Sequence, residues 1–359
     1  MNLRIPGPVP LPAEIAKAMQ KPMIDHRGPE FAALLLRVTA ALKRIFQTDN
    51  DLLIFTSSGT GALEAALVNT ISPGDHVLAF SAGAFGDKFA QMARAFGAAV
   101  TQVDFEWGSA IEPERVARAV RENSATRAVL VTHNETSTGV LHPLQNIARA
   151  VRENSDAVLI VDAVSSLGAV KVQTDAWGID LIATAAQKAW ACPPGLAMVS
   201  ISPRAWKAAA TAKTPRYYFD FAEMKKWTLK GQTPFTPAVL NYYALDQSVA
   251  MIEAEGIANV YARHARIAQR VRDTAKRMGF ALVAEERFAS PTATALTLPQ
   301  GIQAEDLRRV AREEFGLVIA GGQGKLSGKI IRIGHLGWVS EEEIDRAMRA
   351  LDEAMEKVQ

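Results

Sequence analysis

The sequence predicts an α/β fold in which a large domain with a mostly parallel sheet precedes a smaller C-terminal α+β domain. Between residues 52 and 161, short apolar runs alternate with amphipathic helical patterns. Strands separated by helices of about ten residues form right-handed βαβ units, and their continuous apolar runs indicate burial on both faces. Beyond about residue 278 the order changes to strand, helix, two strands and helix. A chain of 359 residues is long enough for two domains.

The composition is that of an ordinary globular protein, with 48% hydrophobic and 22% charged residues. The net charge is +2 and no long block of like charge occurs, so nothing favours binding to nucleic acid or to an anionic membrane. No apolar run has the length of a membrane-spanning helix, and the first residues lack the pattern of a signal peptide. The single cysteine, Cys192, excludes an internal disulfide. We therefore expect a cytoplasmic protein.

The N-terminal residues 1–20 are expected to form an arm. Three prolines and one glycine in residues 5–10 favour an extended, stiff segment. This segment is either a surface arm or a strap in which Gly7 lets the backbone approach a ligand. The large domain is predicted at 21–255 and begins with a helix at 29–46, whose apolar residues recur every three to four positions.

A possible anion site follows the first predicted strand, at residues 52–55. The next six residues read Thr-Ser-Ser-Gly-Thr-Gly and lead into a helix at 62–68. The free N–H groups and the dipole of a helix N-terminus favour an anion, and Ser58 and Thr60 add hydroxyl groups. The same residues could serve only as a helix N-cap. The segment matches neither a P-loop nor a dinucleotide-binding turn.

The remaining elements follow the same alternation. Strands of the large domain are predicted at 77–80, 98–103, 127–132, 157–161, 180–186 and 195–201, and helices at 85–96, 113–121, 143–152 and 236–255. Residues 203–235 are predicted to be irregular and partly an interface. The small domain, 256–359, is expected to contain helices at 257–278, 304–314 and 340–357 and strands at 294–298, 317–320 and 329–333, and Ser340 with Glu343 fits a capping box.

Two ionisable residues stand at the ends of buried strands. Asp162 follows four apolar residues, and Lys188 follows a second apolar run. The separation between the two residues corresponds to about one crossover connection plus one strand. Asp162 could instead cap the next loop, and most lysines lie on the surface. However, a poorly solvated acid and amine in one place suit an aldehyde cofactor with a ring nitrogen. The pair thus leads to the hypothesis of a pyridoxal phosphate enzyme.

Other polar and aromatic residues have two interpretations each. Phe85 could stack on a flat ring or belong to the core. Arg332 stands in an apolar strand, where it needs an internal salt bridge or binds the carboxylate of a substrate. Residues 321–324, rich in glycine, are interpreted as a flexible lip. Cys192 is assigned to packing, and no histidine or cysteine spacing indicates a metal site.

Seven segments together resemble the class V (fold type I) pyridoxal phosphate aminotransferases, in particular the alanine–glyoxylate and serine–glyoxylate branch. They are Pro6-Gly7-Pro8, residues 26–31, 58–66, 133–140 and 161–166, Gln187-Lys188 and Arg332-Ile333-Gly334. The resemblance covers essentially the whole chain. It implies a large domain with a seven-stranded sheet between helices, pyridoxal 5′-phosphate as cofactor and a homodimer with shared active sites.

The resemblance also implies roles for individual residues. Lys188 would form a Schiff base with the cofactor and move the Cα proton of the substrate, while Asp162 would keep the pyridine nitrogen protonated. Phe85 replaces a Trp that is frequent in the mammalian enzymes and would stack on the ring. The remaining cofactor contacts would come from Thr136 at the ring hydroxyl, Val164 at the other ring face, and Ser58, Gly59, Thr60 and Gln187 at the phosphate.

Two further sets of contacts follow from the same resemblance. Thr236 and Thr233 would reach the phosphate of the neighbouring subunit; the mammalian branch has Tyr in place of Thr233. Arg332 would bind the α-carboxylate of the substrate, with the backbone near Gly7 closing over it. The implied reaction is a ping-pong transfer of an amino group from alanine, serine or aspartate to glyoxylate or a similar 2-oxo acid.

Two other functions fit the same fold. A lyase or a cysteine desulfurase is one alternative, but a desulfurase needs a cysteine in the later chain and none follows Cys192. A subunit that keeps the fold without catalysis is the other, since related chains have been named hydrogenase subunits. Intact Lys188, Asp162 and Arg332 argue against that loss of catalysis.

Overall fold

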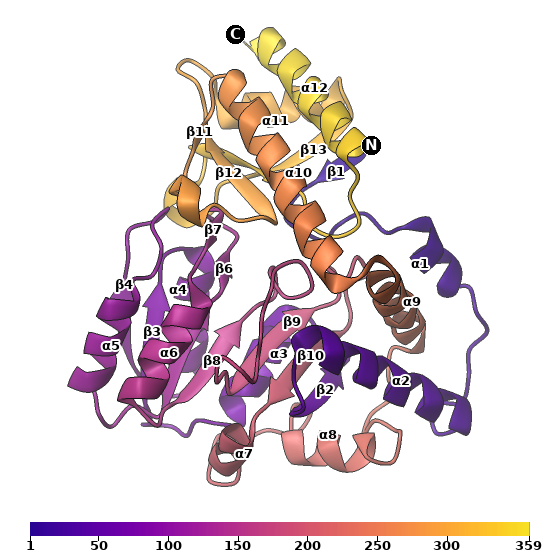
Figure 1. The fold of residues 1–359 in the computed structure, drawn as a ribbon, viewed down its shortest axis with the longest axis vertical. Coiled ribbons are helices and arrows are strands. Elements are labelled where there is room, and N and C mark those ends of the chain that lie inside the picture. Colours follow the sequence, from indigo (N-terminus) through magenta and orange to yellow (C-terminus); the bar gives the residue numbers. More distant parts are fainter. Residues whose placement is uncertain (359) are drawn as a thin grey trace.

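The computed structural model describes residues 1–358, and its larger part is built on a seven-stranded sheet (Figure 1). The strand order is β2-β10-β9-β8-β5-β3-β4. Only β10 runs antiparallel to its neighbours, so the predicted mostly parallel sheet is confirmed. The strands are β2 (Asp51–Phe55), β3 (His76–Ser81), β4 (Ala99–Asp104), β5 (Ala128–Thr132), β8 (Val158–Asp162), β9 (Leu181–Ala185) and β10 (Ala197–Ile201).

Helices cover both faces of this sheet. Along β2, Ile54 packs into one apolar cluster while Leu53 and Phe55 pack into the other, as the alternation of side chains along a strand requires. The first cluster includes helices α2 (Pro29–Phe46), α5 (Pro113–Glu122), α6 (Leu144–Asn154) and α9 (Val239–Glu255). The second includes α3 (Gly59–Val68), α4 (Ala84–Ala95), α7 (Pro203–Ala209) and α8 (Phe221–Thr228).

The prediction that residues 203–235 are irregular is wrong, because α7 and α8 lie there. Each helix has a capped start: the Ser202 hydroxyl accepts a hydrogen bond from Ala205 N at 3.1 Å, and the Asp220 carboxylate accepts one from Glu223 N at 2.8 Å. Both are short, with seven residues in α7 and eight in α8. Their packing onto the sheet stabilises them, while the caps were the only local signals.

The smaller part contains a five-stranded sheet in the order β1-β13-β14-β12-β11. The predicted strands and helices of this region are present: β12 (Ala293–Thr297), β13 (Leu317–Gly321), β14 (Ile330–Gly334), α10 (Ile257–Arg277), α11 (Ala304–Glu313) and α12 (Glu341–Val358). The predicted capping box is confirmed, with Ser340 N donating to Glu343 Oε2 at 2.8 Å and Glu343 N donating to Ser340 Oγ at 3.2 Å. Shorter elements are β11 (Ala281–Leu282), the hairpin of β6 (Asn134–Glu135) and β7 (Val140–Leu141), and the 3₁₀ turns η1 (Glu286–Phe288) and η2 (Gly324–Leu326).

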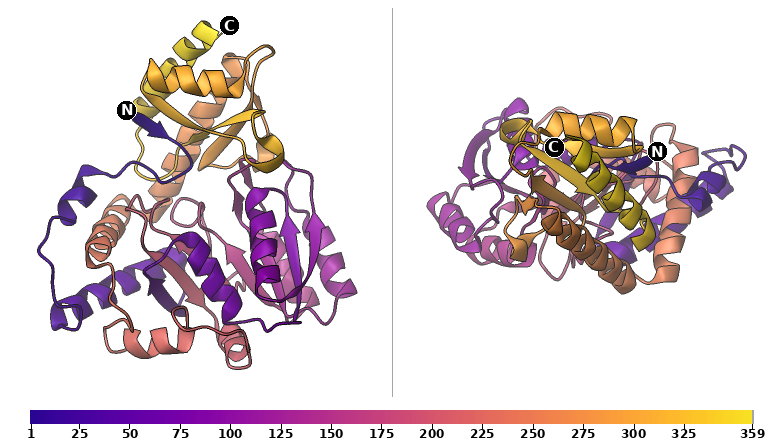
Figure 2. Two further views of the ribbon diagram at one scale, coloured as in Figure 1. Left: turned by 180° about the vertical axis from the view of Figure 1, so that it is seen from behind. Right: turned by 90° about the horizontal axis from the view of Figure 1, so that it is seen from above.

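The N-terminal arm connects the two parts. Its first residues form β1 (Asn2–Arg4), which pairs in parallel with β13 of the smaller sheet. The buried Arg4 also makes an ion pair of 3.1 Å with Glu343. The arm then descends to α1 (Ala13–Ala18), which packs on α9 (Figure 2). The division of the chain at residues 20 and 255 stays a prediction.

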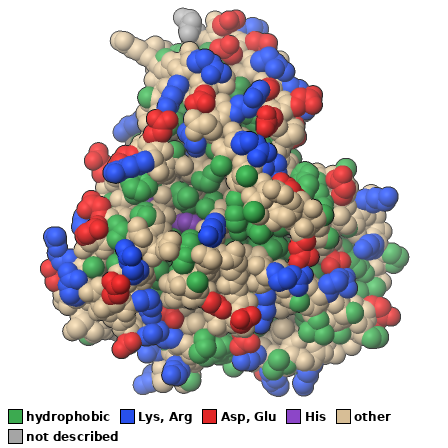
Figure 3. All heavy atoms as spheres, viewed as in Figure 1, with side chains coloured by type: hydrophobic (Ala, Val, Ile, Leu, Met, Phe, Trp, Pro, Cys, Tyr) green, Lys and Arg blue, Asp and Glu red, His purple; other side chains and the backbone are tan. Residues whose placement is uncertain are grey.

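The surface carries interspersed acidic and basic side chains on the face seen in Figure 3. Within residues 1–358, no helix combines the length and the apolar character needed to cross a membrane.

We predict that Gly334→Ala loosens the arm. A Cβ atom at this position would lie 2.1 Å from Ile5 O and 2.7 Å from Pro6 N, and these backbone atoms must shift. We expect a loss of about 1–3 kcal/mol in unfolding free energy, typical of overpacking, and faster proteolytic cleavage in residues 5–8. Gly301→Ala is the control, because its φ of +90° costs local strain but its Cβ meets open space. Cleavage of Gly334→Ala at the wild-type rate would contradict the prediction.

Candidate active site

The predicted site residues gather at one edge of the seven-stranded sheet. Because β10 runs opposite to both its neighbours, β2 is parallel to β9, and six strands have their carboxyl ends at the same edge. Ligands of α/β sheets bind at this edge. From it come Ser58 and Gly59 after β2, Phe85 after β3, Thr136 after β5, Asp162 at the end of β8, and Gln187 and Lys188 after β9.

These residues line two hollows. The larger has a volume of about 420 Å³ and includes Gly7, Phe85, Thr136, Lys188 and Arg332 in its lining. The smaller, of about 50 Å³, includes Gly59, Thr60, Phe85, Asp162 and Val164. Phe85 lines both, so the two hollows meet at its side chain.

Asp162 is a buried acid at the floor of this region. Its Oδ1 accepts a hydrogen bond from Val164 N at 2.9 Å. Burial raises the pKa of Asp162 to about 6; the hydrogen bond opposes this shift, the nearby Glu135 adds to it, and Lys188 opposes it. A carboxyl group with this pKa is well suited to share a proton with a basic nitrogen.

Lys188 lies directly beneath the N-terminal arm. Its Nζ donates a hydrogen bond to Pro6 O at 2.5 Å. A Cβ atom on Gly7 would lie 2.7 Å from the same Nζ, and Gly7 has a φ of +118°, so both the contact and the backbone require glycine. Burial lowers the pKa of Lys188 to about 8, although the charge of Asp162 opposes the shift. The arm therefore lies against the amine as a strap.

Arg332 is buried on β14 and binds only neutral groups. Its Nε donates to Gly321 O at 2.8 Å, and its Nη1 donates to Thr136 O at 3.2 Å and to Gln323 Oε1 at 3.3 Å. Among residues 1–358, Arg332 has no carboxylate within ion-pair distance, so the alternative of an internal salt bridge is wrong. Burial lowers the pKa of Arg332 to about 10. This guanidinium group can still bind a carboxylate.

The helix start that the sequence predicts as an anion site is present at α3, and its use by an anion stays a prediction. Ser58 is its N-cap and accepts a hydrogen bond from Gly61 N at 3.4 Å. A Cβ atom on Gly59 would lie 2.7 Å from Val164 Cγ2, so glycine permits the close approach of α3 to the loop after β8. Lys88, which the sequence analysis missed, lines the same hollow and donates a hydrogen bond to Thr60 Oγ1 at 3.4 Å. Its position three residues after Phe85 on α4 was the only signal.

Three other predicted residues have distinct environments. The side-chain oxygen of Gln187 is buried and accepts no hydrogen bond from any described residue. Thr233 and Thr236 line neither hollow. The Thr233 hydroxyl donates to Phe235 O at 2.7 Å, and Thr236 is exposed. The fold of one chain thus does not bring these two threonines to the other site residues.

Glu135 belongs to the 133–140 segment noted in the sequence, but the sequence assigned it no role of its own. Its carboxylate accepts hydrogen bonds from Phe85 N at 3.1 Å, Gly86 N at 3.0 Å and Ser137 N at 3.1 Å. Burial raises the pKa of Glu135, and these hydrogen bonds oppose the shift. Glu135 therefore fixes the first turn of α4, which carries Phe85. An acid three residues after the end of the buried strand β5 was the available signal.

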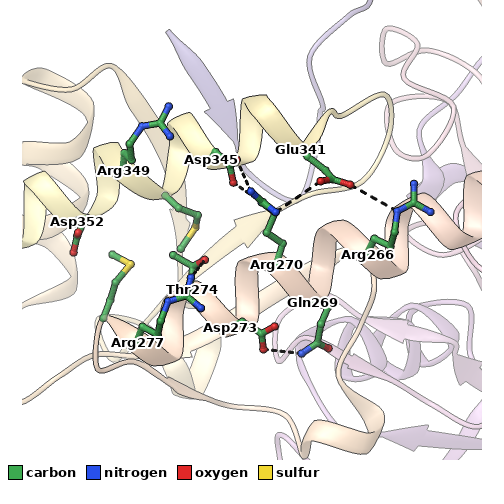
Figure 4. A pocket seen from close by; sticks show the side chains of 12 residues that line it. Arg266, Gln269, Arg270, Asp273, Thr274, Arg277, Glu341, Asp345, Arg349 and Asp352 are labelled. Carbon is green, nitrogen blue, oxygen red and sulfur yellow. Dashed lines mark hydrogen bonds and ion pairs between the residues drawn. The ribbon is translucent and has the colours of Figure 1, made fainter.

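A larger hollow lies elsewhere, between α10 and α12 (Figure 4), with a volume of about 690 Å³. Its charged groups largely neutralise one another: Arg270 binds Asp345 at 2.5 Å, and Arg266 approaches Glu341 at 3.7 Å. It contains no residue from the carboxyl edge of the large sheet. In the described part of the chain, no group of three or more His, Cys, Asp or Glu side chains could hold a metal ion.

Comparisons with known proteins agree on one family. Residues 14–346 match the family model of class-V aminotransferases. The chain is 42% identical to a soluble hydrogenase 42 kDa subunit of Anabaena cylindrica, covering 98% of this chain and 92% of that protein. It is 38% identical to L-aspartate–glyoxylate aminotransferase of Paracoccus denitrificans, covering 94% and 86%. The crystal structure of alanine–glyoxylate aminotransferase from Nostoc sp. superposes with a TM-score of 0.95 at 31% identity, covering 99% and 95%.

We predict that Glu135→Gln destabilises the protein by about 1–3 kcal/mol, because an amide NH₂ replaces one of two oxygen atoms that face N–H donors. Urea unfolding measures the change. Glu122→Gln, at an exposed position, is the matched control and should stay within about 0.5 kcal/mol of the wild type. Equal stability of the two variants would show that Glu135 does not hold α4.

We predict that the amine of Lys188 becomes reactive near pH 8 in cofactor-free protein. Only a neutral amine reacts, and a pKa lowered from 10.5 to about 8 moves the rise in rate to lower pH. Asp162→Asn should move the midpoint lower still, because the negative charge of Asp162 raises the pKa of Lys188. Acylation of Lys188, followed by peptide mass spectrometry from pH 6 to 11, checks both shifts. A midpoint near 10 in the wild type would contradict the assignment.

Proposed function

The chain belongs to the class-V aminotransferase family, and from this premise we propose that it moves an amino group from alanine, serine or aspartate to glyoxylate or a similar 2-oxo acid by a ping-pong mechanism. The enzyme class, a pyridoxal 5′-phosphate-dependent aminotransferase, follows from the family. The observation that carries the proposed chemistry is the buried Arg332, which has only neutral partners and shares a hollow with Lys188.

The residues present fit pyridoxal 5′-phosphate. The start of α3 offers free N–H groups and hydroxyl groups for the phosphate, and the unpaired buried oxygen of Gln187 lies next to Lys188 in sequence. The Nζ atom of Lys188 would hold the cofactor, and the carboxyl group of Asp162 would bind the cofactor's ring nitrogen. Phe85, Thr136 and Val164 are the expected contacts of the ring. When bound, the cofactor supplies a ring that accepts electrons from the substrate.

Lys188 is the group proposed to move a proton at the Cα atom of the substrate. Its lowered pKa leaves a useful fraction of neutral amine near pH 8, which is the form that accepts a proton. Pro6 O accepts a hydrogen bond from Nζ, and Gly7 of the strap lies close against the same atom. Arg332 would orient the substrate through its α-carboxylate, so that the Cα proton meets Lys188.

The acceptor and the donor are inferred from relatives. Two of the relatives described above are named for glyoxylate, with aspartate or alanine as the partner amino acid. One relative is named a soluble hydrogenase subunit, which is not the name of an aminotransferase. The geometry around Lys188 argues for catalysis, because a buried amine beside a buried acid is costly to maintain without a function.

We also propose a homodimer with shared sites. Tyr217 is 81% exposed, and the neighbouring Tyr218 stacks on Phe235 with ring centroids 4.8 Å apart. This aromatic patch precedes the exposed Thr236 and reaches the turn between β2 and α3, where the Tyr218 hydroxyl donates to Thr56 O at 3.3 Å. A two-fold axis through the patch would bring each chain's Thr236 and Thr233 towards the other chain's phosphate site.

We also propose a cytoplasmic location, since the single cysteine forms no internal disulfide.

The direct test exposes purified holoenzyme to alanine, serine or aspartate and follows the visible absorption of the bound cofactor. We expect a donor to change the spectrum and glyoxylate or pyruvate to restore it.

Arg332→Ala should raise KM for amino acids about 10- to 100-fold, because a charged hydrogen bond contributes about 1.5–3 kcal/mol. Arg332→Lys keeps the positive charge but loses the bidentate geometry of the guanidinium group. Its KM for amino acids should lie between those of the wild type and Arg332→Ala. An unchanged KM in Arg332→Ala would refute the clamp, and a spectrum that no donor changes would refute the proposed substrates.

The homodimer is tested by light scattering of Tyr217→Glu. A charge in an apolar interface is expected to produce monomers and to weaken cofactor retention, whereas Tyr217→Phe keeps the ring and should behave as wild type. A monomeric wild type with full activity would be incompatible with shared sites.

A further inference from the structure

We propose that Arg308 is a second carboxylate-binding group of the active site and that the preferred amino donor is a short dicarboxylic amino acid such as aspartate. The inference rests on the proposed function, because it concerns the substrate of the same hollow. It goes further by assigning the contact that discriminates aspartate from alanine and serine.

Arg308 reaches the hollow from α11, a helix outside the large sheet. It lines the same 420 Å³ hollow as Lys188 and Arg332. Its Nε donates to Ile319 O at 3.3 Å, and its Nη1 lies 2.9 Å from the place of a Cβ atom on Gly321. Since Arg332 Nε donates to Gly321 O at 2.8 Å, both guanidinium groups contact the same residue.

The two positive groups have no internal acid between them. In the described chain, neither Arg308 nor Arg332 has a carboxylate within 4.0 Å. The adjacent Arg309 does, with Asp306 at 3.3 Å and Glu313 at 3.6 Å on the outer face of α11. Acids are thus available on this helix, but Arg308 is directed away from them and towards the hollow.

Glu135 acts on Arg332 only from beyond ion-pair distance, so within 4.0 Å both guanidinium groups of the hollow lack a carboxylate in the described chain. Burial is the main cause of the lowered pKa of Arg332, and the negative charge of Glu135 opposes it. The positive charge of Arg308 lowers this pKa further, because the two guanidinium groups repel each other. One carboxylate on Arg332 would leave Arg308 as a free donor in the same cavity. A second carboxylate on the ligand would give both groups an anionic partner, and such complementarity selects between ligands of similar size.

Backbone segments from the strap and the lip also line the hollow. Ile5, Pro6 and Gly7 belong to the strap, and Gly321, Gly322 and Gln323 belong to the lip. In this lip the amide oxygen of Gln323 is the only side-chain acceptor of Arg332 among residues 1–358. A substrate carboxylate is a stronger acceptor and would replace it.

The experiment measures kcat/KM of the holoenzyme for aspartate and for alanine with glyoxylate as acceptor. We expect aspartate to be preferred in the wild type and Arg308→Met to lower kcat/KM for aspartate about 10- to 100-fold, while the value for alanine changes less than about threefold. Arg308→Lys should recover part of the loss for aspartate. Arg312→Met removes the same charge from the same helix outside the hollow and should leave both values unchanged.

A binding readout separates this proposal from activity. Calorimetry should show that wild-type holoenzyme binds succinate more tightly than propionate, and that Arg308→Met removes most of this difference. Equal loss for both amino acids, or a wild type that prefers alanine, overturns the role of Arg308 even where transamination is intact. If no amino acid reacts and succinate does not bind, the proposed function fails with it. Thermal unfolding of each variant identifies a loss that comes from misfolding.

Discussion

Asp162 and Lys188 are both buried at the carboxyl edge of one sheet, and burial shifts their pKa values towards each other, to about 6 and about 8. A protein retains two such groups only where the surrounding structure fixes them. The fixing elements are β8 and β9, which are adjacent and parallel, with Asp162 paired to Ala183 in the ladder. The remaining site features, from the start of α3 to Glu135, are arranged around this pair.

The N-terminal arm makes the smaller sheet part of the same site. β1 pairs with β13, Ile5 packs against Gly334 of β14, and Pro6 O accepts the hydrogen bond of Lys188. A movement of the smaller sheet would therefore be transmitted to the amine through the backbone of a few residues. The glycines at 7 and 334 make this path possible, because a Cβ atom at either position would collide with it.

The positive charge of the hollow is its most informative property for inferring a ligand. Arg332 and Arg308 face a cavity with neutral partners only, whereas most arginines on the surface of the smaller part, such as Arg270 and Arg309, have acidic neighbours. The proposed partner of both groups is an anionic ligand. Glu135 lies close enough to raise the pKa values of both Arg332 and Asp162, and so connects the substrate side of the hollow with the cofactor side.

The sequence by itself determined the type and order of nearly all strands and long helices, because each carries an apolar period of its own. It also identified Asp162, Lys188 and the start of α3, whose chemistry is local. It missed β1, which exists only by pairing with a strand more than three hundred residues away, and the short helices α7 and α8, which packing stabilises. The tertiary structure alone decided that Arg332 has no internal acid, that Gly7 lies on Lys188, and that Glu135 and Arg308 face the site. Such facts depend on distances between segments remote in sequence, and no local pattern encodes them.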